Sequence, residues 1–547
     1  MTTKTKFFTD SRSSTPEPTY LGVVDVKTTA GKDEDYDEKS DVSDVQEGDI
    51  DVVFRGVGLL PDEVYSRTLS WWRAWVRQRI VQNVEWESKV LGRMQELIRT
   101  PFLDAYFVYT SSLGTHTFFM TVLPAFFFFG HEDVGHGLLL VLAFGVYASS
   151  FLKDLICAPR PYAPPVTRLT IGDHHLEYGF PSTHSTNSMS IALQLFTVVY
   201  TLYKTPVSSP TPLVTAMNST VSGIVEDLIT PETALSQTWF IAMSAVLGFY
   251  IFSIVFGRLY TGMHSFTDCA VGILLGTAIW ATYFFFGTII DTWVASSGWI
   301  VPATIIPLCL LLVHRHPQPV DDCPCFEDAI AFISVAMGDY LTRWVMGRYH
   351  INEKYLTHVM PGSPMGSWAE MSTWWSLAAA KMVTGVLAIF AWRIFAKFLS
   401  HRMLPPLFRF LAQLVTLPHR RYYTPATDYK NFPAEKGLRA IPSVIDLPGA
   451  LEGFEADGIG ASTAHSKELG HGQGRQIKLR KGKLEKSPSG AGIGLSVEEM
   501  GGKEVEVVKH YDADVLTKVF VYCGIAVMAT GVMPVAFTLL GWGLRVR

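Results

Sequence analysis

Charge is scarce in this 547-residue chain: only 17% of the residues are charged, whereas 48% are hydrophobic. A soluble globular protein usually carries charge on about a quarter of its residues. The apolar residues are gathered into runs long enough to cross a bilayer, so a polytopic membrane protein is predicted. Because the basic residues form no compact soluble domain, no nucleic-acid partner is expected.

Cysteine is scarce as well. The chain has six cysteines, most of them in or beside apolar runs, which argues against a disulfide framework. Cys323 and Cys325 flank one proline, and no second pair follows to complete a zinc site, so no structural metal is expected. The first residues lack the apolar core of a signal peptide, and the first internal span is therefore expected to direct insertion.

Hydrophobic runs indicate an all-α transmembrane bundle of about eight or nine spans, because helices satisfy their own backbone groups in lipid. The run at 328–346 is the weakest, since it contains Asp339 and Arg343. The runs lie at 115–130, 134–152, 188–203, 238–256, 269–288, 298–313, 328–346, 374–399 and 517–541.

Polar segments divide the chain further. The acidic start and a Gly/Lys-rich stretch late in the chain have too little apolar surface to fold. In residues 62–100 tryptophans alternate with arginines, which fits either an interfacial helix or a soluble helix packed on the body. The predicted regions are a disordered N-terminal region (1–61), an interfacial or amphipathic helical region (62–100), a membrane domain carrying the polar motifs (101–290), additional transmembrane helices (291–422), a disordered insertion (423–510) and a C-terminal transmembrane helix (511–547).

Three polar segments interrupt the apolar runs at the ends of predicted spans. They are "KDLICAPRP" (153–161), "FPSTHS" (180–185) and "GRLYTGMHSFTD" (257–268). Counting the spans between them places all three on one face of the membrane. Segments about a hundred residues apart can therefore meet in space.

The side chains of these segments suit an anion with several oxygens. Three permanent cations stand out: Lys153, Arg160 and Arg258. Their only evident acidic neighbours in sequence are Asp154 and Asp268, and Arg presents paired donors that fit phosphate. Ser182 and Thr183 precede an apolar run, so a helix starting at Pro181 would point free backbone N–H groups at the anion.

The histidines supply the chemistry. His264 and Asp268 are four residues apart, which places them on one face of a helix. The carboxylate can then accept from one imidazole nitrogen and leave the other free as a nucleophile. His184 is suited to protonating a leaving alkoxide. The sum is phosphoryl transfer through a phosphohistidine, stabilised by cations and using no metal.

Each feature alone has a structural explanation. A basic residue at a membrane edge usually extends to the headgroups, a single histidine is usually only hydrogen-bonded, and an Asp near a helix start is often a cap. Their combination on one face favours a functional site.

The motifs resemble the three signatures of the type 2 phosphatidic acid phosphatase superfamily, in order and in spacing. Arg160 follows Lys153 by seven positions, His264 follows Arg258 by six, and Asp268 follows His264 by four. Two positions depart from that pattern: Thr183 stands where many members have Gly, and Gly257 stands where many have Ser. Neither departure removes a charged group, so activity is still expected.

The closer resemblance is to fungal long-chain base 1-phosphate phosphatases. It extends to "LDAYFVYTSSLGTHTFF", "RPYAPPVTRLT" and "PVDDCPCFEDAIAF". The resemblance implies a haloperoxidase-like helical bundle that removes phosphate from sphingoid base 1-phosphates in the endoplasmic reticulum, without a cofactor or metal. It implies that His264 is the nucleophile, His184 the proton donor and Asp268 the residue that orients His264. It implies the phosphate ligands Lys153, Arg160, Ser182, Thr183 and Arg258.

Three alternatives remain. A broad lipid phosphatase acting on phosphatidic or lysophosphatidic acid would share every one of these residues. An enzyme that transfers the phosphate group to another lipid would use a similar histidine pair. Enzymes of that kind, however, lack the segment with Lys153 and Arg160 in this form. A transporter or scaffold would have the same site without catalysis.

Two indications conflict on which side of the membrane the site faces. The family resemblance implies a lumenal site, which leaves the Asn218 glycosylation sequon cytosolic and unused. The Arg-rich segment 65–99 would share the active-site face, and the positive-inside rule would make that face cytosolic. The expected partners are a lipid phosphate and membrane lipids, and the sequence does not indicate an oligomeric state.

Overall fold

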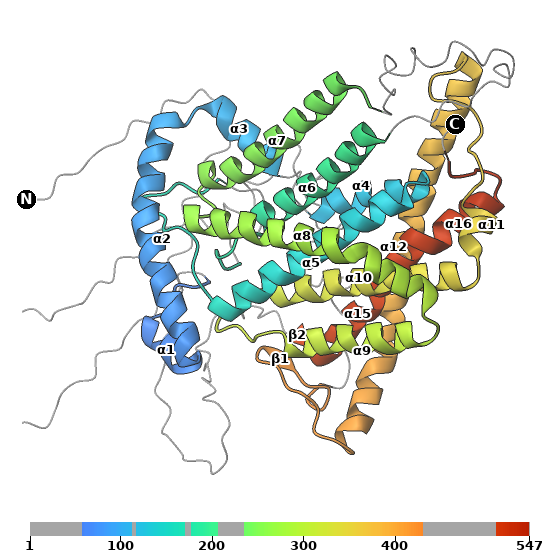
Figure 1. Cartoon of the computed structure of the whole chain (residues 1–547). Coiled ribbons are helices and arrows are strands. Elements are labelled where there is room, and N and C mark those ends of the chain that lie inside the picture. Colours follow the sequence, from blue (N-terminus) through green and yellow to red (C-terminus); the bar gives the residue numbers. More distant parts are fainter. Residues whose placement is uncertain (1–56, 112–115, 170–176, 206–234, 430–509, 546–547) are drawn as a thin grey trace, which may run out of the picture.

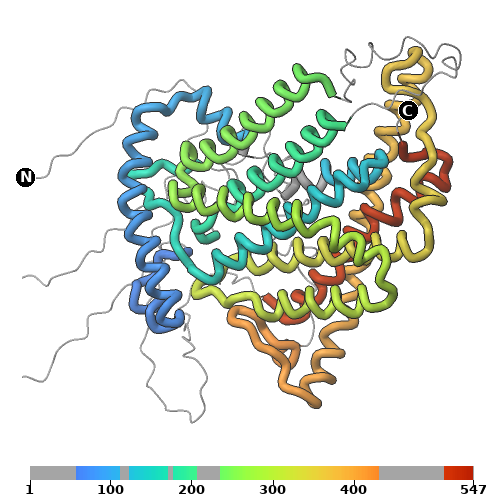
Figure 2. The backbone as a smooth tube through the Cα atoms, in the orientation of Figure 1, coloured from blue at the N-terminus to red at the C-terminus, as the bar shows by residue number. Residues whose placement is uncertain are grey.

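The computed structural model describes residues 57–111, 116–169, 177–205, 235–429 and 510–545. These residues are mostly helical, as Figures 1 and 2 show. The only strands within the described ranges are β1 (Tyr423–Thr424) and β2 (His510–Tyr511), which pair in parallel. The predicted fold class, a helical membrane bundle, is confirmed. Residues 1–56 and 430–509, which hold most of the two predicted disordered regions, lie outside the described residues.

Each predicted hydrophobic run lies on a helix. In chain order the helices are α1 (Asp62–Thr68), α2 (Trp71–Ile98), α3 (Pro101–Ser111), α4 (His116–Phe128), α5 (Glu132–Ile156), α6 (Thr183–Lys204), α7 (Gln237–Tyr260), α8 (Phe266–Ser296), α9 (Ile300–Arg315), α10 (Cys325–Arg348), α11 (Ile351–Tyr355), α12 (Trp368–Ala412), α15 (Asp512–Val527), the π-helical turn η4 (Met528–Val532) and α16 (Met533–Leu539).

Five segments within the described ranges are long and apolar enough to cross a bilayer: α5, α7, α8, α12 and the α15–α16 segment. The expected count of eight or nine remains a prediction. Of the other runs, α9 is shorter, and α10 contains Asp339 and Arg343. Helix α3 has 11 residues and reaches about 16 Å, too short to cross the hydrocarbon core alone.

Helix α5 lies at the centre of the bundle. It packs against α6, α8 and α10, and 67% of its most apolar 18-residue stretch is buried. The corresponding share is 17% for α7, α8 and α12, whose outer faces are apolar and exposed in the protein alone. This arrangement is expected of a membrane protein, in which the peripheral helices present their apolar faces to lipid.

Helices α6 and α8 approach closely through two small residues. A Cβ atom on Gly276 would lie 2.2 Å from the carbonyl oxygen of Thr186, and one on Gly272 would lie 2.7 Å from that of Ser182. Larger side chains at these positions would force the two backbones apart. The spacing of small residues along one helix face is a common device of membrane helix packing. Here it brings together the N-terminal ends of α6 and α8.

Helix α2 lies across the ends of the bundle (Figure 1) and contacts α5, α7 and α8. The Arg73 guanidinium donates to the carbonyl oxygens of Leu155 (2.6 Å) and Asp154 (2.9 Å), and Arg77 donates to that of Cys157 (3.1 Å). These arginines satisfy carbonyls that the C-terminal end of α5 leaves unpaired. The outer face of α2 exposes several tryptophans: Trp71, Trp72, Trp75 and Trp86. Helix α2 therefore packs on the bundle, and its interfacial position remains a prediction.

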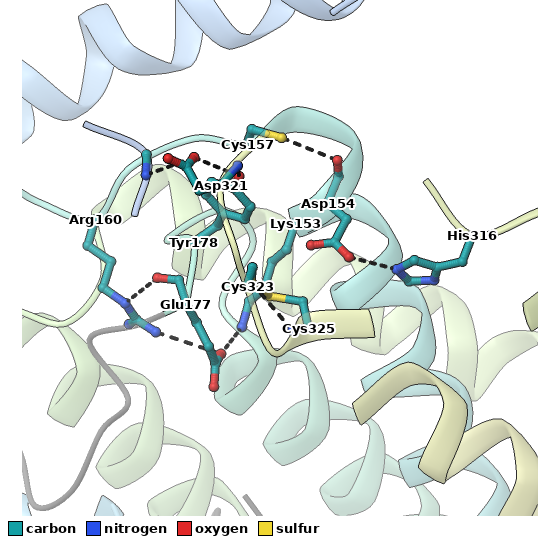
Figure 3. Close-up of a disulfide and its surroundings, with 11 residues drawn as sticks. Lys153, Asp154, Cys157, Arg160, Glu177, Tyr178, His316, Asp321, Cys323 and Cys325 are labelled. Atoms are coloured by element: carbon teal, nitrogen blue, oxygen red, sulfur yellow. Dashed lines mark hydrogen bonds and ion pairs between the residues drawn. A yellow bond between two sulfur atoms is a disulfide. The ribbon is translucent and has the colours of Figure 1, made fainter. Parts of the chain in front are cut away.

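The structure differs from expectation at one cysteine pair. Cys323 and Cys325 form a disulfide, buried in an apolar cluster with Cys157 and Tyr178 (Figure 3). The bond joins residues two apart and links no distant segments. It is therefore not a framework for the fold, although its formation was not expected from the spacing of the two cysteines.

Candidate active site

The three polar segments meet at the end of the bundle beside α2. Helices α5 and α7 end there, and α6 and α8 begin there (Figure 1). The Arg160 Nη1 donates to the carbonyl oxygen of Met263 (3.0 Å), which joins the first segment to the third. The Ser182 N–H donates to the carbonyl oxygen of Asp268 (3.1 Å), which joins the second to the third.

His264 lies in the turn between α7 and α8. Gly262 makes this turn possible, because its φ of +65° is in the left-handed region and a Cβ there would lie 2.3 Å from Val166 Cγ1. The backbone N–H groups of Met263 and His264 both donate to the carbonyl oxygen of Arg258. The turn thus fixes the backbone of His264 against the end of α7.

The hydrogen bonds of His264 define its tautomer. Its Nδ1 lies 2.9 Å from the carbonyl oxygen of Gly179. A carbonyl can only accept, so Nδ1 carries the hydrogen and Nε2 carries the lone pair. Nε2 lies 3.2 Å from Nη1 of Arg160, which can only donate. The nitrogen with the lone pair is therefore presented among cations.

The surroundings also favour the neutral imidazole. Burial lowers the pKa of His264 well below its ordinary value, and the positive charges of Arg160, Arg258 and Lys153 lower it further. Only 1% of the side chain is exposed. His264 is consequently held as the unprotonated form that a nucleophile requires.

Asp268 is placed differently from the prediction. Its Oδ2 accepts from the Ser265 N–H (2.8 Å) in a capping box that begins α8, and it lies 3.7 Å from His264 Nδ1, beyond hydrogen-bond distance. His264 precedes the first residue of α8, so the two side chains do not lie along one helix face, and the orienting role of Asp268 remains a prediction. The Gly179 carbonyl contacts the ring directly, and Asp268 orders the turn next to it.

The start of α6 supplies a hydroxyl without a partner. The helix begins at Thr183 rather than Pro181, with Ser182 as its N-cap. The Ser182 hydroxyl accepts from the Ser185 N–H, so it serves the helix as well as the site. The Thr183 hydroxyl is buried and has no hydrogen-bond partner among the described residues. It is thus available to a ligand. His184 follows in the first turn of α6 and is half-buried.

The three predicted cations are all buried, with 2–4% of each exposed. Their acidic partner is one that the sequence reasoning missed. Glu177 Oε2 lies 2.5 Å from Lys153 Nζ and 3.8 Å from Arg160 Nη2 (Figure 3). Asp154, an expected neighbour, instead pairs with His316 at 3.0 Å, on the other side of α5. The only sequence signal for Glu177 was an acid five residues before Ser182.

This arrangement has a definite chemical capacity. A neutral, oriented imidazole faces the Arg160 guanidinium, and the charges of Arg258 and Lys153 also act on it. It lies at the end of a helix whose first turn has a hydroxyl with no partner among the described residues. A phosphate ester has the charge and the oxygens that such a set would bind. A nucleophilic nitrogen beside it can attack the phosphorus. The fold and the site together define a membrane-embedded helical protein with a histidine-centred phosphate site.

Comparison with known proteins agrees. Residues 135–290 match the PAP2 superfamily. The chain is 34% identical, over 395 residues, to a dihydrosphingosine 1-phosphate phosphatase of Schizosaccharomyces pombe, covering 71% of this chain and 81% of that protein. It is 32% identical to a dihydrosphingosine 1-phosphate phosphatase of Saccharomyces cerevisiae, covering 53% and 65% of the two chains. A lipid phosphate phosphatase delta of Arabidopsis thaliana is 27% identical, covering 48% and 56%.

The chain belongs to the PAP2 superfamily, in the family of these fungal phosphatases. No solved structure is a significant match. The matched residues 135–290 contain all eight predicted site residues: Lys153, Arg160, Ser182, Thr183, His184, Arg258, His264 and Asp268.

Proposed function

We propose that this protein is a membrane-bound phosphatase that hydrolyses sphingoid long-chain base 1-phosphates to the base and inorganic phosphate. The observation that carries the proposal is the presentation of His264 Nε2, neutral and buried, beside Arg160. The substrate class is supported by the names of the fungal relatives.

The proposed reaction has two steps at His264. In the first, Nε2 attacks phosphorus, the P–O ester bond breaks, and His184 gives a proton to the leaving alkoxide. In the second, the now neutral His184 takes a proton from water, which attacks phosphorus and breaks the P–N bond. The cations Lys153, Arg160 and Arg258 stabilise the charge on the phosphoryl oxygens in both steps.

Trapping the phosphoenzyme tests this proposal. The full chain is mixed with 32P-labelled dihydrosphingosine 1-phosphate and quenched within one turnover. We expect a label on His264 that survives alkali and is lost in acid, as P–N bonds are. The variant His264→Ala should carry no label, whereas His358→Ala, at an exposed histidine away from the site, should label as wild type does. Labelling of His264→Ala would contradict the role of His264.

A broad lipid phosphatase is the main alternative, since one relative is named a lipid phosphate phosphatase. Phosphatidic or lysophosphatidic acid would use the same cations and the same histidines. Measuring kcat/KM for a sphingoid base phosphate and for lysophosphatidic acid side by side distinguishes the two. A preference for lysophosphatidic acid would favour the broad enzyme.

We further propose that the protein resides in the endoplasmic reticulum with a lumenal active site. The family resemblance supports this orientation. The positive-inside count against it loses weight, because Arg73 and Arg77 cap α5 and so have a structural reason to be there. Asn218 lies outside the described residues, in the connection between α6 and α7, whose other ends meet at the site. A lumenal site therefore predicts no endoglycosidase-sensitive glycan on Asn218, and a glycan there would reverse the orientation.

A further inference from the structure

The carboxylate of Glu177 pairs with two of the predicted phosphate cations. Its carboxylate lies between Lys153 and Arg160 (Figure 3), and its side chain is only 12% exposed. A phosphate ester that binds these cations must compete with this carboxylate. The proposed reaction itself gives Glu177 no role.

The backbone around Glu177 is held in place, so the residue cannot leave the site as a loop. The Arg160 Nε donates to the carbonyl oxygen of Glu177 (3.0 Å). The Tyr178 hydroxyl donates to Asp321 (2.7 Å), and the Gly179 N–H donates to the carbonyl oxygen of Ala158 (2.9 Å). When a phosphate binds Lys153, the Glu177 carboxylate can only rotate and remains beside it. Two anions then share one buried site.

A second acid acts on the same place. Asp328, in the first turn of α10, is 4% exposed, and its Oδ1 has no hydrogen-bond partner among the described residues. It lies close enough to Glu177 and Lys153 for their charges to act on it. Its neighbour Glu327 is by contrast paired with Lys518 at 2.7 Å. Once Lys153 turns to a phosphate, the close ion pair between Lys153 and Glu177 is lost.

An ammonium group next to the phosphate would replace that ion pair. In a sphingoid base 1-phosphate, the protonated amine is on the carbon adjacent to the one that bears the phosphate ester. Phosphatidic and lysophosphatidic acids have no amine, so their binding would break the ion pair of Glu177 without replacing it. Breaking a buried ion pair is costly, and specificity often arises from such a penalty against the wrong ligand.

We infer that Glu177, assisted by Asp328, binds the substrate ammonium and so selects amine-bearing lipid phosphates over amine-free ones. This inference rests on the proposed hydrolysis of long-chain base phosphates. Glu177 thereby has two partners: Lys153, as the structure shows, and the substrate amine when Lys153 holds the phosphate.

The test compares two substrates on the full chain in detergent micelles: dihydrosphingosine 1-phosphate and lysophosphatidic acid. In Glu177→Gln, kcat/KM for the amine-bearing substrate should fall about 10- to 100-fold, the usual worth of a hydrogen bond to a charged group. For lysophosphatidic acid it should rise, because the opposing charge is gone. Glu177→Asp, which keeps the charge, should retain most of the preference. Asp328→Asn should change the ratio in the same direction as Glu177→Gln.

Glu87→Gln is the matched control. Glu87 is a buried carboxylate that accepts from the Thr267 N–H (3.1 Å) near the start of α8, away from the predicted phosphate cations. Its substitution should leave the substrate ratio as in wild type. If Glu177→Gln lowers turnover of both lipids equally, the inference is wrong and Glu177 only supports Lys153. If the wild-type chain hydrolyses neither lipid, the proposed function itself fails.

Discussion

Two buried histidines at opposite ends of the bundle show how differently the same side chain can be used. His136 lies near the start of α5 and is 1% exposed, as is His264 at the other end of the bundle. His136 Nδ1 lies 2.5 Å from Asp339, and its Nε2 lies 3.0 Å from Asp291. Both ring nitrogens therefore face carboxylates, and neither is left for a ligand.

His264 has the opposite surroundings. One ring nitrogen is held by a backbone carbonyl, and the other faces a guanidinium group. Among the described residues cations predominate around it, whereas acids predominate around His136, where the nearby Arg343 is paired to Asp133. Burial of a histidine is therefore no indication of function by itself. What matters is whether the second nitrogen meets a permanent partner or a set of charges that a ligand would complete.

The comparison predicts that removal of His264 has the largest effect on activity. His264→Ala should lower kcat/KM for dihydrosphingosine 1-phosphate by about 10⁴-fold or more, as loss of a nucleophile does. The thermal unfolding midpoint should stay near that of the wild type, because the folded state already held this imidazole neutral among cations. Phosphate release and unfolding in the same detergent measure the two quantities. Residual activity within a hundredfold of wild type would contradict the role of His264 as nucleophile.

His136→Ala should give the reverse result. It leaves the fully buried Asp339 without its partner, which for a buried pair costs about 3–5 kcal/mol. The unfolding midpoint should fall clearly, while the activity of the protein that remains folded should drop by less than about tenfold. An unchanged midpoint together with lost turnover would show that the acidic end takes part in the reaction, and the distinction between the two ends would fail.

The fold was largely predictable, because membrane helices are written in the sequence as runs of apolar residues. All nine runs lie on helices. The number of spans was not settled, since α10 mixes acids and a base with apolar residues and lies in the interior. The close contact of α6 with α8 through Gly272 and Gly276 was missed, although a small residue every fourth position was visible.

The residues that form the site were easier to predict from the sequence than their geometry. Charges at span ends, counted onto one face, identified the residues that the structure brings together around His264. The sequence could not show that a capping box at Ser265 would begin α8 after His264 and draw Asp268 away from the ring. Nor could it show that Glu177 and the Gly179 carbonyl, in a connection without periodicity, would return to Lys153 and His264. Contacts made by loops depend on tertiary packing, which local patterns do not encode.

The smallest predicted effect is on pH dependence. Because burial first, and then Arg160, lower the pKa of His264 well below 6.5, the acid limb that His264 contributes to phosphoenzyme formation should lie below about pH 6.5. The stability of the folded protein changes with pH in the same direction as this activity. The unfolded chain takes up this proton at higher pH than the folded one, so the contribution of His264 to stability is complete above about pH 6.5 and is lost as the pH falls towards its folded pKa.

Arg160→Gln tests the origin of this shift. Removing the cation should raise the pKa of His264 and move the acid limb upwards, although burial, the larger cause, remains. The rate itself should fall about 10²- to 10³-fold, so the normalised profile of single-turnover labelling is the quantity to compare. Arg343→Gln, at the acidic end, removes a guanidinium that pairs with Asp133 and should leave the limb in place. An acid limb near pH 6.5 that neither variant moves would mean that the cations bind phosphate without tuning the nucleophile.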